Sequence, residues 1–187
     1  LLGVMGAGYG TSTLNNSIQT PNLYKSDGFG TSVALSGTQM AIGAPYDDGF
    51  GNTGSNFGAV YLYSFDDTNY TNGKLQAIIG TGYTGGKNVN LTLNNDDYFG
   101  FAVSLDGNRL AVGAQRDDGS ANTVTDAGAV YLFTFTDTTF SGGALASTIG
   151  YGYGGAKDIN VAALGTSDYF ATSVSLDGNR LAVGAQR

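Results

Sequence analysis

The sequence contains no cysteine, no histidine and no tryptophan, and only two prolines. The absence of cysteine excludes disulfides, thiolate nucleophiles and cysteine-ligated metals, although it does not fix the cellular compartment. Without histidine, the side chains left for acid–base or nucleophilic chemistry are carboxylates, lysines and tyrosines. Long apolar runs are also missing, since none approaches the ~20 residues of a membrane-spanning helix.

Basic residues are few, because 8 lysines and arginines stand against 15 acidic residues and give a net charge of -7. Such an acidic chain repels phosphate backbones and anionic lipids, and no basic cluster offsets it locally. We therefore expect no nucleic-acid partner and no membrane insertion. The opening LLGVMGAGYG has no initiating methionine and no signal-peptide pattern, so we expect the natural start to lie upstream.

Glycine and aromatic residues are abundant, with 31 Gly, 12 Tyr and 10 Phe. No window of a dozen residues shows the 3.6-residue apolar period of a helix. Together with many Thr, Ser, Asn and Asp residues, this composition indicates short strands joined by turns. The chain is predicted to be all-β.

The sequence repeats with a period of about seventy residues. VSLDGNRLAVGAQR occurs unchanged at 103–116 and 174–187, and Phe29, Phe99 and Phe170 are equivalent, at spacings of 70 and 71. In the second unit, strand-like segments lie at 99–105, 109–115, 128–135 and 144–150. The Asp-Gly pair after the first of them is typical of a tight hairpin. Four antiparallel strands at a fixed period are typical of a propeller blade. A parallel β-helix is the alternative, but no shorter inner period is visible.

We therefore predict a partial β-propeller of four-stranded antiparallel blades. Residues 1–28 would form the last strand of a preceding blade and a linker. Residues 29–98 and 99–169 would each form a blade with its connection, and 170–187 the first two strands of an incomplete blade. A propeller ring typically has at least four blades. The chain is therefore expected to be an open sector whose edges recruit partners, as a fragment of a longer array or through neighbouring copies.

The pattern FGTSVAL…MAIGAP…GAVYLYSF resembles the FG-GAP repeat of integrin α-subunit propellers and large bacterial surface proteins. Phe29-Gly30 and Gly43-Ala44-Pro45 supply its two signatures, while the later units read Gly113-Ala114-Gln115 and Gly184-Ala185-Gln186. In that family an Asp-rich loop between the first two strands binds Ca²⁺. Here the corresponding turn has one Asp or none, whereas Ca²⁺ takes six to eight oxygens. The family's calcium function is therefore not carried over to this turn.

The connection between the second and third strands is a second acidic candidate, reading DDGFGNTG and DDGSANTV. Its oxygen side chains could gather around a hard cation such as Ca²⁺: Asp47, Asp48 and Asn52 in one unit, and Asp117, Asp118, Asn122 and Asp126 in the next. The alternative, which we favour, is a turn whose carboxylates bond to local backbone N–H groups. Ca²⁺ is therefore the one candidate cofactor.

Tyrosines among glycines are candidates for contact with a ligand or subunit: Tyr83, Tyr151 and Tyr153. The aromatic residues of the third strands could form a sugar-stacking platform, but we expect them to pack between blades. Catalysis is not expected, because adjacent acids on one turn do not reach across a cleft. We predict a non-catalytic structural or adhesive module of an extracellular or cell-surface protein, self-assembling edge to edge. Its partners would be other copies, flanking repeats, and a surface protein or glycan ligand. A calcium-dependent ligand-binding module is the alternative.

Overall fold

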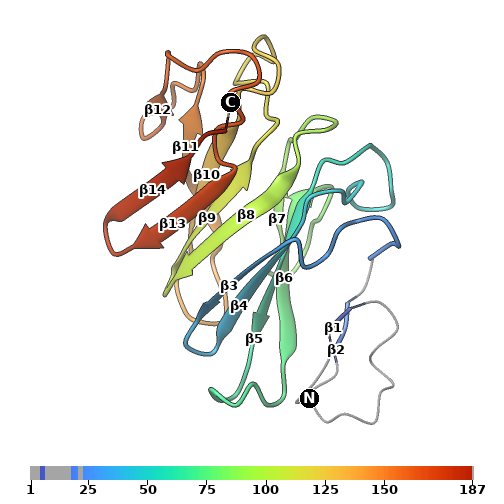
Figure 1. Ribbon diagram of the computed structural model, residues 1–187. Helices are drawn as coiled ribbons and strands as arrows, with labels where there is room; N and C mark the ends of the chain where they lie inside the picture. Colours follow the sequence, from blue (N-terminus) through green and yellow to red (C-terminus); the bar gives the residue numbers. More distant parts are fainter. Residues whose placement is uncertain (1–4, 7–17, 21–22, 187) are drawn as a thin grey trace.

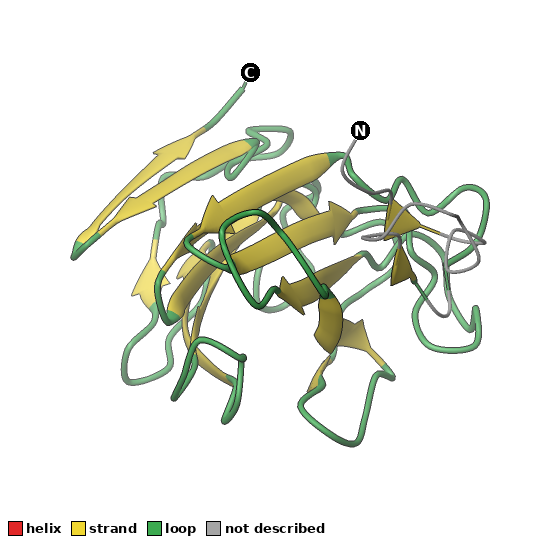
Figure 2. Cartoon of the chain, turned by 90° about the horizontal axis from the view of Figure 1, so that it is seen from below, coloured by secondary structure: helices red, strands yellow, loops and turns green. Residues whose placement is uncertain are grey.

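The computed structural model describes residues 5–6, 18–20 and 23–186 (Figure 1). These residues form strands and loops, and none of them lies in a helix (Figure 2). The described part therefore has no helix that could span a membrane. The prediction of an all-β chain is confirmed.

The first sheet contains five strands in chain order, of which the first four are antiparallel. They are β3 (Ser32–Ser36), β4 (Gln39–Ala44), β5 (Ala59–Ser64), β6 (Lys74–Thr81) and β7 (Val89–Leu91). The fifth strand, β7, runs parallel to β6.

The second sheet repeats this arrangement seventy residues later, again with a parallel last strand. Its strands are β8 (Phe99–Asp106), β9 (Arg109–Ala114), β10 (Ala129–Thr134), β11 (Ala144–Gly150) and β12 (Ile159–Asn160). A third sheet consists of the hairpin β13 (Ser173–Asp177) and β14 (Arg180–Gly184).

At the other end of the chain, β1 (Met5–Gly6) pairs in parallel with β2 (Ile18–Gln19). This pairing repeats that of β6 with β7, where Ile79 faces Val89. Most of the stretch 1–28, predicted to end a preceding blade, lies outside the described residues.

Each complete sheet contains the four antiparallel strands that the sequence predicts, and its long connection adds a short fifth strand by returning alongside the fourth. Asparagine side chains fix this return: Asn88 Oδ1 accepts the N–H of Ile78 at 2.8 Å, and Asn90 Oδ1 accepts that of Gly82 at 2.7 Å. The resulting β7 and β12 are only three and two residues long. Val89-Asn90-Leu91 does alternate between apolar and polar residues, but strands this short lie at or below the usual minimum length and were not predicted.

The sheets pack face to face and share their hydrophobic cores. Val60 and Leu62 of β5 lie in one cluster with Tyr131, Phe133 and Phe135 from the second sheet and its flanking loop. Tyr61 and Tyr63 point to the opposite face of β5, into a separate cluster. Successive residues of the third strands thus face opposite sides of the sheet, and the predicted packing of their aromatic residues is confirmed.

The first strands of successive sheets, β3, β8 and β13, lie side by side (Figure 1). Hydrogen bonds cross between them: Ser32 Oγ donates to the carbonyl oxygen of Gly100 at 2.7 Å, and the N–H of Leu176 donates to Ser104 Oγ at 2.9 Å. The sheets thus fan out from a shared line of first strands, as blades do in a propeller.

Candidate functional site

The loops between the second and third strands hold a buried aspartate in each complete sheet. Asp47 is 1% exposed, and its carboxylate accepts hydrogen bonds from the Tyr61 hydroxyl at 2.8 Å and the Tyr83 hydroxyl at 3.0 Å. The N–H of Gly49 donates a further bond, at 2.8 Å, within the same turn. All the donors are neutral, so the carboxylate is held by hydrogen bonds alone.

The second sheet builds the same cluster around Asp117. Its carboxylate accepts hydrogen bonds from the hydroxyls of Tyr131 at 2.6 Å and Tyr153 at 2.8 Å, and from the N–H of Gly119 at 2.8 Å. Burial raises the pKa of Asp117 and raises that of Tyr131 well above its usual value. These bonds favour the carboxylate form and so oppose part of the effect of burial. We call these two groups the Asp–Tyr–Tyr clusters.

The Asp–Tyr–Tyr clusters explain where two of the predicted contact residues lie. Tyr83 is 1% exposed, so it packs inside the first sheet and has no surface to offer a ligand or subunit. Tyr153 and Tyr151 are half-buried. In each cluster the two tyrosines follow the aspartate by 14 and 36 residues. This spacing alone does not indicate that the three side chains are in contact.

The neighbouring acids serve a different part of the loop. Asp48 Oδ1 accepts the N–H of Asn56 at 2.7 Å, and Asp118 Oδ1 accepts that of Asp126 at 2.7 Å, each closing the loop across eight residues. Asn52 and Asn122 adopt positive φ angles, 53° and 51°, which asparagine tolerates better than most residues.

Within each loop, the two adjacent aspartates predicted as cation ligands therefore bind different groups. The first accepts hydrogen bonds from tyrosine hydroxyls, and the second accepts a backbone N–H that closes the loop. Among the described residues, no three acidic side chains lie close enough together to hold a metal ion. This geometry favours the alternative of carboxylates bonded to turns, and calcium binding stays a hypothesis that a melt with and without the ion tests.

A third set of aspartates lies two residues before the first phenylalanine of each unit. Asp27, Asp97 and Asp168 each accept the N–H of the residue three positions earlier, at 2.7, 2.7 and 2.8 Å. These hydrogen bonds close a turn ahead of the first strand of each unit. Burial raises the pKa of Asp97 to about 8 and that of Asp27 to about 6, which the sequence alone did not indicate.

Backbone hydrogen bonds join each connection to the loop of the preceding sheet. The N–H groups of Tyr98 and Phe99 donate to the carbonyl oxygens of Asn56 and Phe57 at 3.3 and 3.1 Å. Seventy-one residues later, Tyr169 and Phe170 donate to Asp126 and Ala127 at 3.0 and 2.9 Å. Backbone hydrogen bonds between neighbouring sheets therefore hold the loops that carry the Asp–Tyr–Tyr clusters in place.

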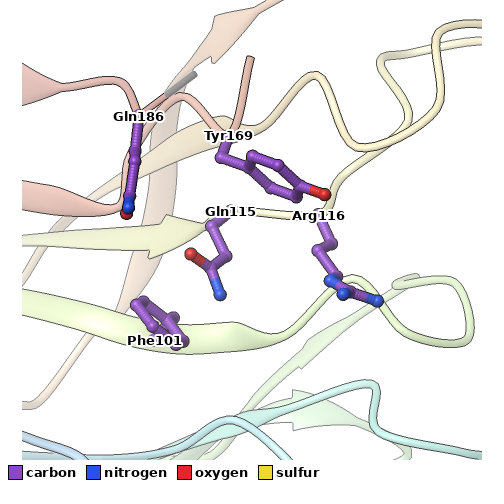
Figure 3. Close-up of a pocket in the computed structure, with 5 residues that line it drawn as sticks. All are labelled: Phe101, Gln115, Arg116, Tyr169 and Gln186. Carbon is purple, nitrogen blue, oxygen red and sulfur yellow. The ribbon is translucent and has the colours of Figure 1, made fainter. Parts of the chain in front are cut away.

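Two cavities open near these loops. One, of about 340 Å³, lies between the second and third sheets and is lined by Phe101, Gln115, Arg116, Tyr169 and Gln186 (Figure 3). The other, of about 330 Å³, lies beside the second Asp–Tyr–Tyr cluster, with Tyr131, Tyr153, Asn122 and Asn94 on its wall. Of the predicted residues, Tyr153 and Asn122 line a cavity. Sequence reasoning missed Phe101, Gln115 and Gln186, although Phe101 and Gln115 stand where the first unit has Thr31 and Pro45.

Successive sheets that share cores and align their first strands define a partial β-propeller. Residues 21–63 and 93–133 match the sequence model of the FG-GAP repeat family, so the two complete units of the chain carry FG-GAP repeats. No curated protein sequence matches the chain.

Proposed function

We propose that the chain is a non-catalytic structural and adhesive module of a secreted or cell-surface protein, and that it associates edge to edge with further copies of the repeat. FG-GAP repeats are typical of extracellular proteins. The buried aspartates support a role without bond chemistry, because their carboxylates are enclosed by tyrosines and turn N–H groups.

One observation carries the association: equivalent apolar side chains are buried in β8, which packs on the first sheet, and exposed in β3. Val103 and Leu105 of β8 are 9% and 6% exposed against the first sheet. The corresponding Val33 and Leu35 of β3 are 53% and 49% exposed. Burial of such side chains stabilises by about 25 cal/mol per Å² of apolar surface, so β3 offers an apolar face to another repeat.

The opposite end of the sector is open as well. β9 lies between β8 and β10, whereas β14, with the same sequence, pairs within the described residues with β13 alone. A strand edge with unpaired N–H and C=O groups accepts a further strand. Leu62 is fully buried, but the equivalent Leu132 is only half-buried beside this short sheet.

Sedimentation velocity over a range of protein concentrations tests this proposal. We expect the average mass to rise with concentration, and Val33→Asp to suppress the rise by placing a charge on the apolar face. Ile159→Asp is the matched control, since Ile159 is 55% exposed at the outer end of the second sheet. A chain that sediments as a monomer at every concentration would exclude edge-to-edge association.

A further inference from the structure

The cavity between the second and third sheets, lined by Phe101, Gln115, Arg116, Tyr169 and Gln186, exists because the two sheet junctions are built differently. At the first junction, the ring of Tyr46 lies edge-on to Tyr98, with ring centroids 5.1 Å apart. The same ring also closes over Gly28, where an added Cβ would lie 2.8 Å from Tyr46 Cδ2. An aromatic side chain therefore fills this position between the first two sheets.

At the second junction, Arg116 replaces Tyr46 and Gln115 replaces Pro45. The guanidinium of Arg116 lies over the ring of Tyr98, 4.8 Å from its centroid, and not against the equivalent Tyr169. The space that Tyr46 fills at the first junction is thus left open. Figure 3 shows the five lining side chains arranged around it.

The lining chemistry selects a ligand class. Two rings, Phe101 and Tyr169, provide apolar faces, while two amides and a guanidinium provide planar hydrogen-bonding groups. The volume of about 340 Å³ is at the small end of ligand-binding cavities. We infer that this cavity binds one neutral sugar unit of a glycan, whose C–H faces pack on the rings and whose hydroxyls bond to the polar groups.

Charge distinguishes a neutral sugar from charged ligands. The Arg116 Nε lies 3.8 Å from Asp126 Oδ1, and the Tyr169 hydroxyl is 3.5 Å from Asp126 Oδ2, so a carboxylate already faces the single cation of the cavity. The whole chain carries a net charge of -7, which disfavours an anionic ligand at long range. Arg116 in turn repels a cation. Its stacking on Tyr98 also holds the guanidinium in place before a ligand arrives, which lowers the entropy cost of binding.

This inference deepens the adhesive part of the proposed function and rests on it. Titration with maltohexaose, cellohexaose and chitohexaose tests it, with an oligogalacturonate as the acidic comparison. Backbone amide NMR shifts are followed at a protein concentration where the chain is monomeric. A failure to bind then leaves edge-to-edge association untouched. We expect shifts at Gln115, Arg116 and Tyr169 with at least one neutral hexasaccharide, with a dissociation constant in the millimolar range for a single open site.

Two variants make the test specific. Arg116→Tyr restores the side chain of the first junction, and we expect it to fill the cavity and weaken binding at least tenfold while the fold is kept. Arg180→Gln removes an equal charge from an exposed hairpin outside the cavity and should leave binding unchanged. The inference is overturned if no neutral hexasaccharide shifts these amides, if the oligogalacturonate binds more tightly, or if Arg116→Tyr binds as well as the unaltered chain.

Discussion

Gly43 of the first sheet lies directly against Gly100 of the second, so that a Cβ on Gly43 would stand 1.9 Å from the carbonyl oxygen of Gly100. Gly113 has the same relation to Ala171, at 2.3 Å. The first glycine of the Gly-Ala-Pro signature is thus needed because the Phe-Gly signature of the next unit packs directly against it. The second signature of one unit and the first signature of the next unit are thus the two sides of one backbone contact.

Gly43→Ala is expected to destabilise the chain by about 2–3 kcal/mol, since neither backbone can move away without separating the sheets. Chemical denaturation measures the loss in the free energy of unfolding. Gly154→Ala is the matched control, because Gly154 has no atom within 4 Å of the added Cβ and no positive φ. Equal stability of the two variants would contradict the close contact.

Tyr131→Phe removes the shortest hydrogen bond to the buried carboxylate of Asp117. Hydrogen bonds to charged groups contribute about 1.5–3 kcal/mol, so we expect a loss of this order, observed as a fall in melting temperature. Tyr151→Phe, in a half-buried tyrosine whose hydroxyl bonds to none of the described residues, should change the melting temperature little. If both substitutions act alike, the Asp–Tyr–Tyr cluster does not hold the loop.

The stability of the chain is expected to fall as the pH rises from about 4 to about 8. Burial raises the folded-state pKa of Asp27 to about 6 and that of Asp97 to about 8, whereas an ordinary aspartate side chain has a pKa of 3.8. The folded state therefore binds these protons more tightly than the unfolded state, and stability is lost as each carboxyl ionises. A pKa difference of one corresponds to about 1.4 kcal/mol.

Thermal melts across this pH range, with Asp97→Asn and Asp27→Asn, provide the check. The asparagine oxygen can still accept the N–H that each carboxyl accepts, while the titration is removed. We expect Asp97→Asn to flatten the profile up to pH 8 and Asp27→Asn only up to about pH 6. A melting temperature that rises between pH 4 and 8 would contradict the assignment.

Addition of Ca²⁺ is expected to leave the melting temperature unchanged relative to a chelator. Asp47 and Asp48 already accept bonds from different donors, and a ligand that binds only the folded state would raise the melting temperature. Asp118→Asn, which keeps an acceptor for the N–H of Asp126, serves as the comparison. An upward shift with Ca²⁺ that Asp118→Asn abolishes would establish the calcium-dependent alternative.

The sequence predicted the blades because their long strands carry a clear period-two pattern and repeat with little change. The faces of β5 and β10 follow directly from this alternation. It did not predict β7 and β12, which are only three and two residues long. Side chains hold them beside the fourth strand: Asn88 and Asn90 in the first sheet, and Asp158 and Asn160 in the second. The acidic loops were identified as turns, but the partnership of Asp117 with Tyr153 spans 36 residues and depends on the fold.

The cavity at the second junction illustrates a different limit. Equivalence between repeats draws attention to what is shared, whereas the cavity arises from the replacement of Tyr46 by Arg116. Phe101 lies in β8 and Tyr169 in the connection that leads to β13, so only the packed sheets bring these two side chains together.

Amide hydrogen exchange, followed by NMR, tests edge-to-edge association most directly. The segments 109–114 and 180–185 are identical in sequence, so their intrinsic exchange rates match and any difference reports structure. In dilute solution the outward amides of β14 should exchange faster than their β9 counterparts, which bond to β10, and raising the concentration should slow them. If the amides of β14 exchange at the same fast rate at every concentration, no strand joins this edge.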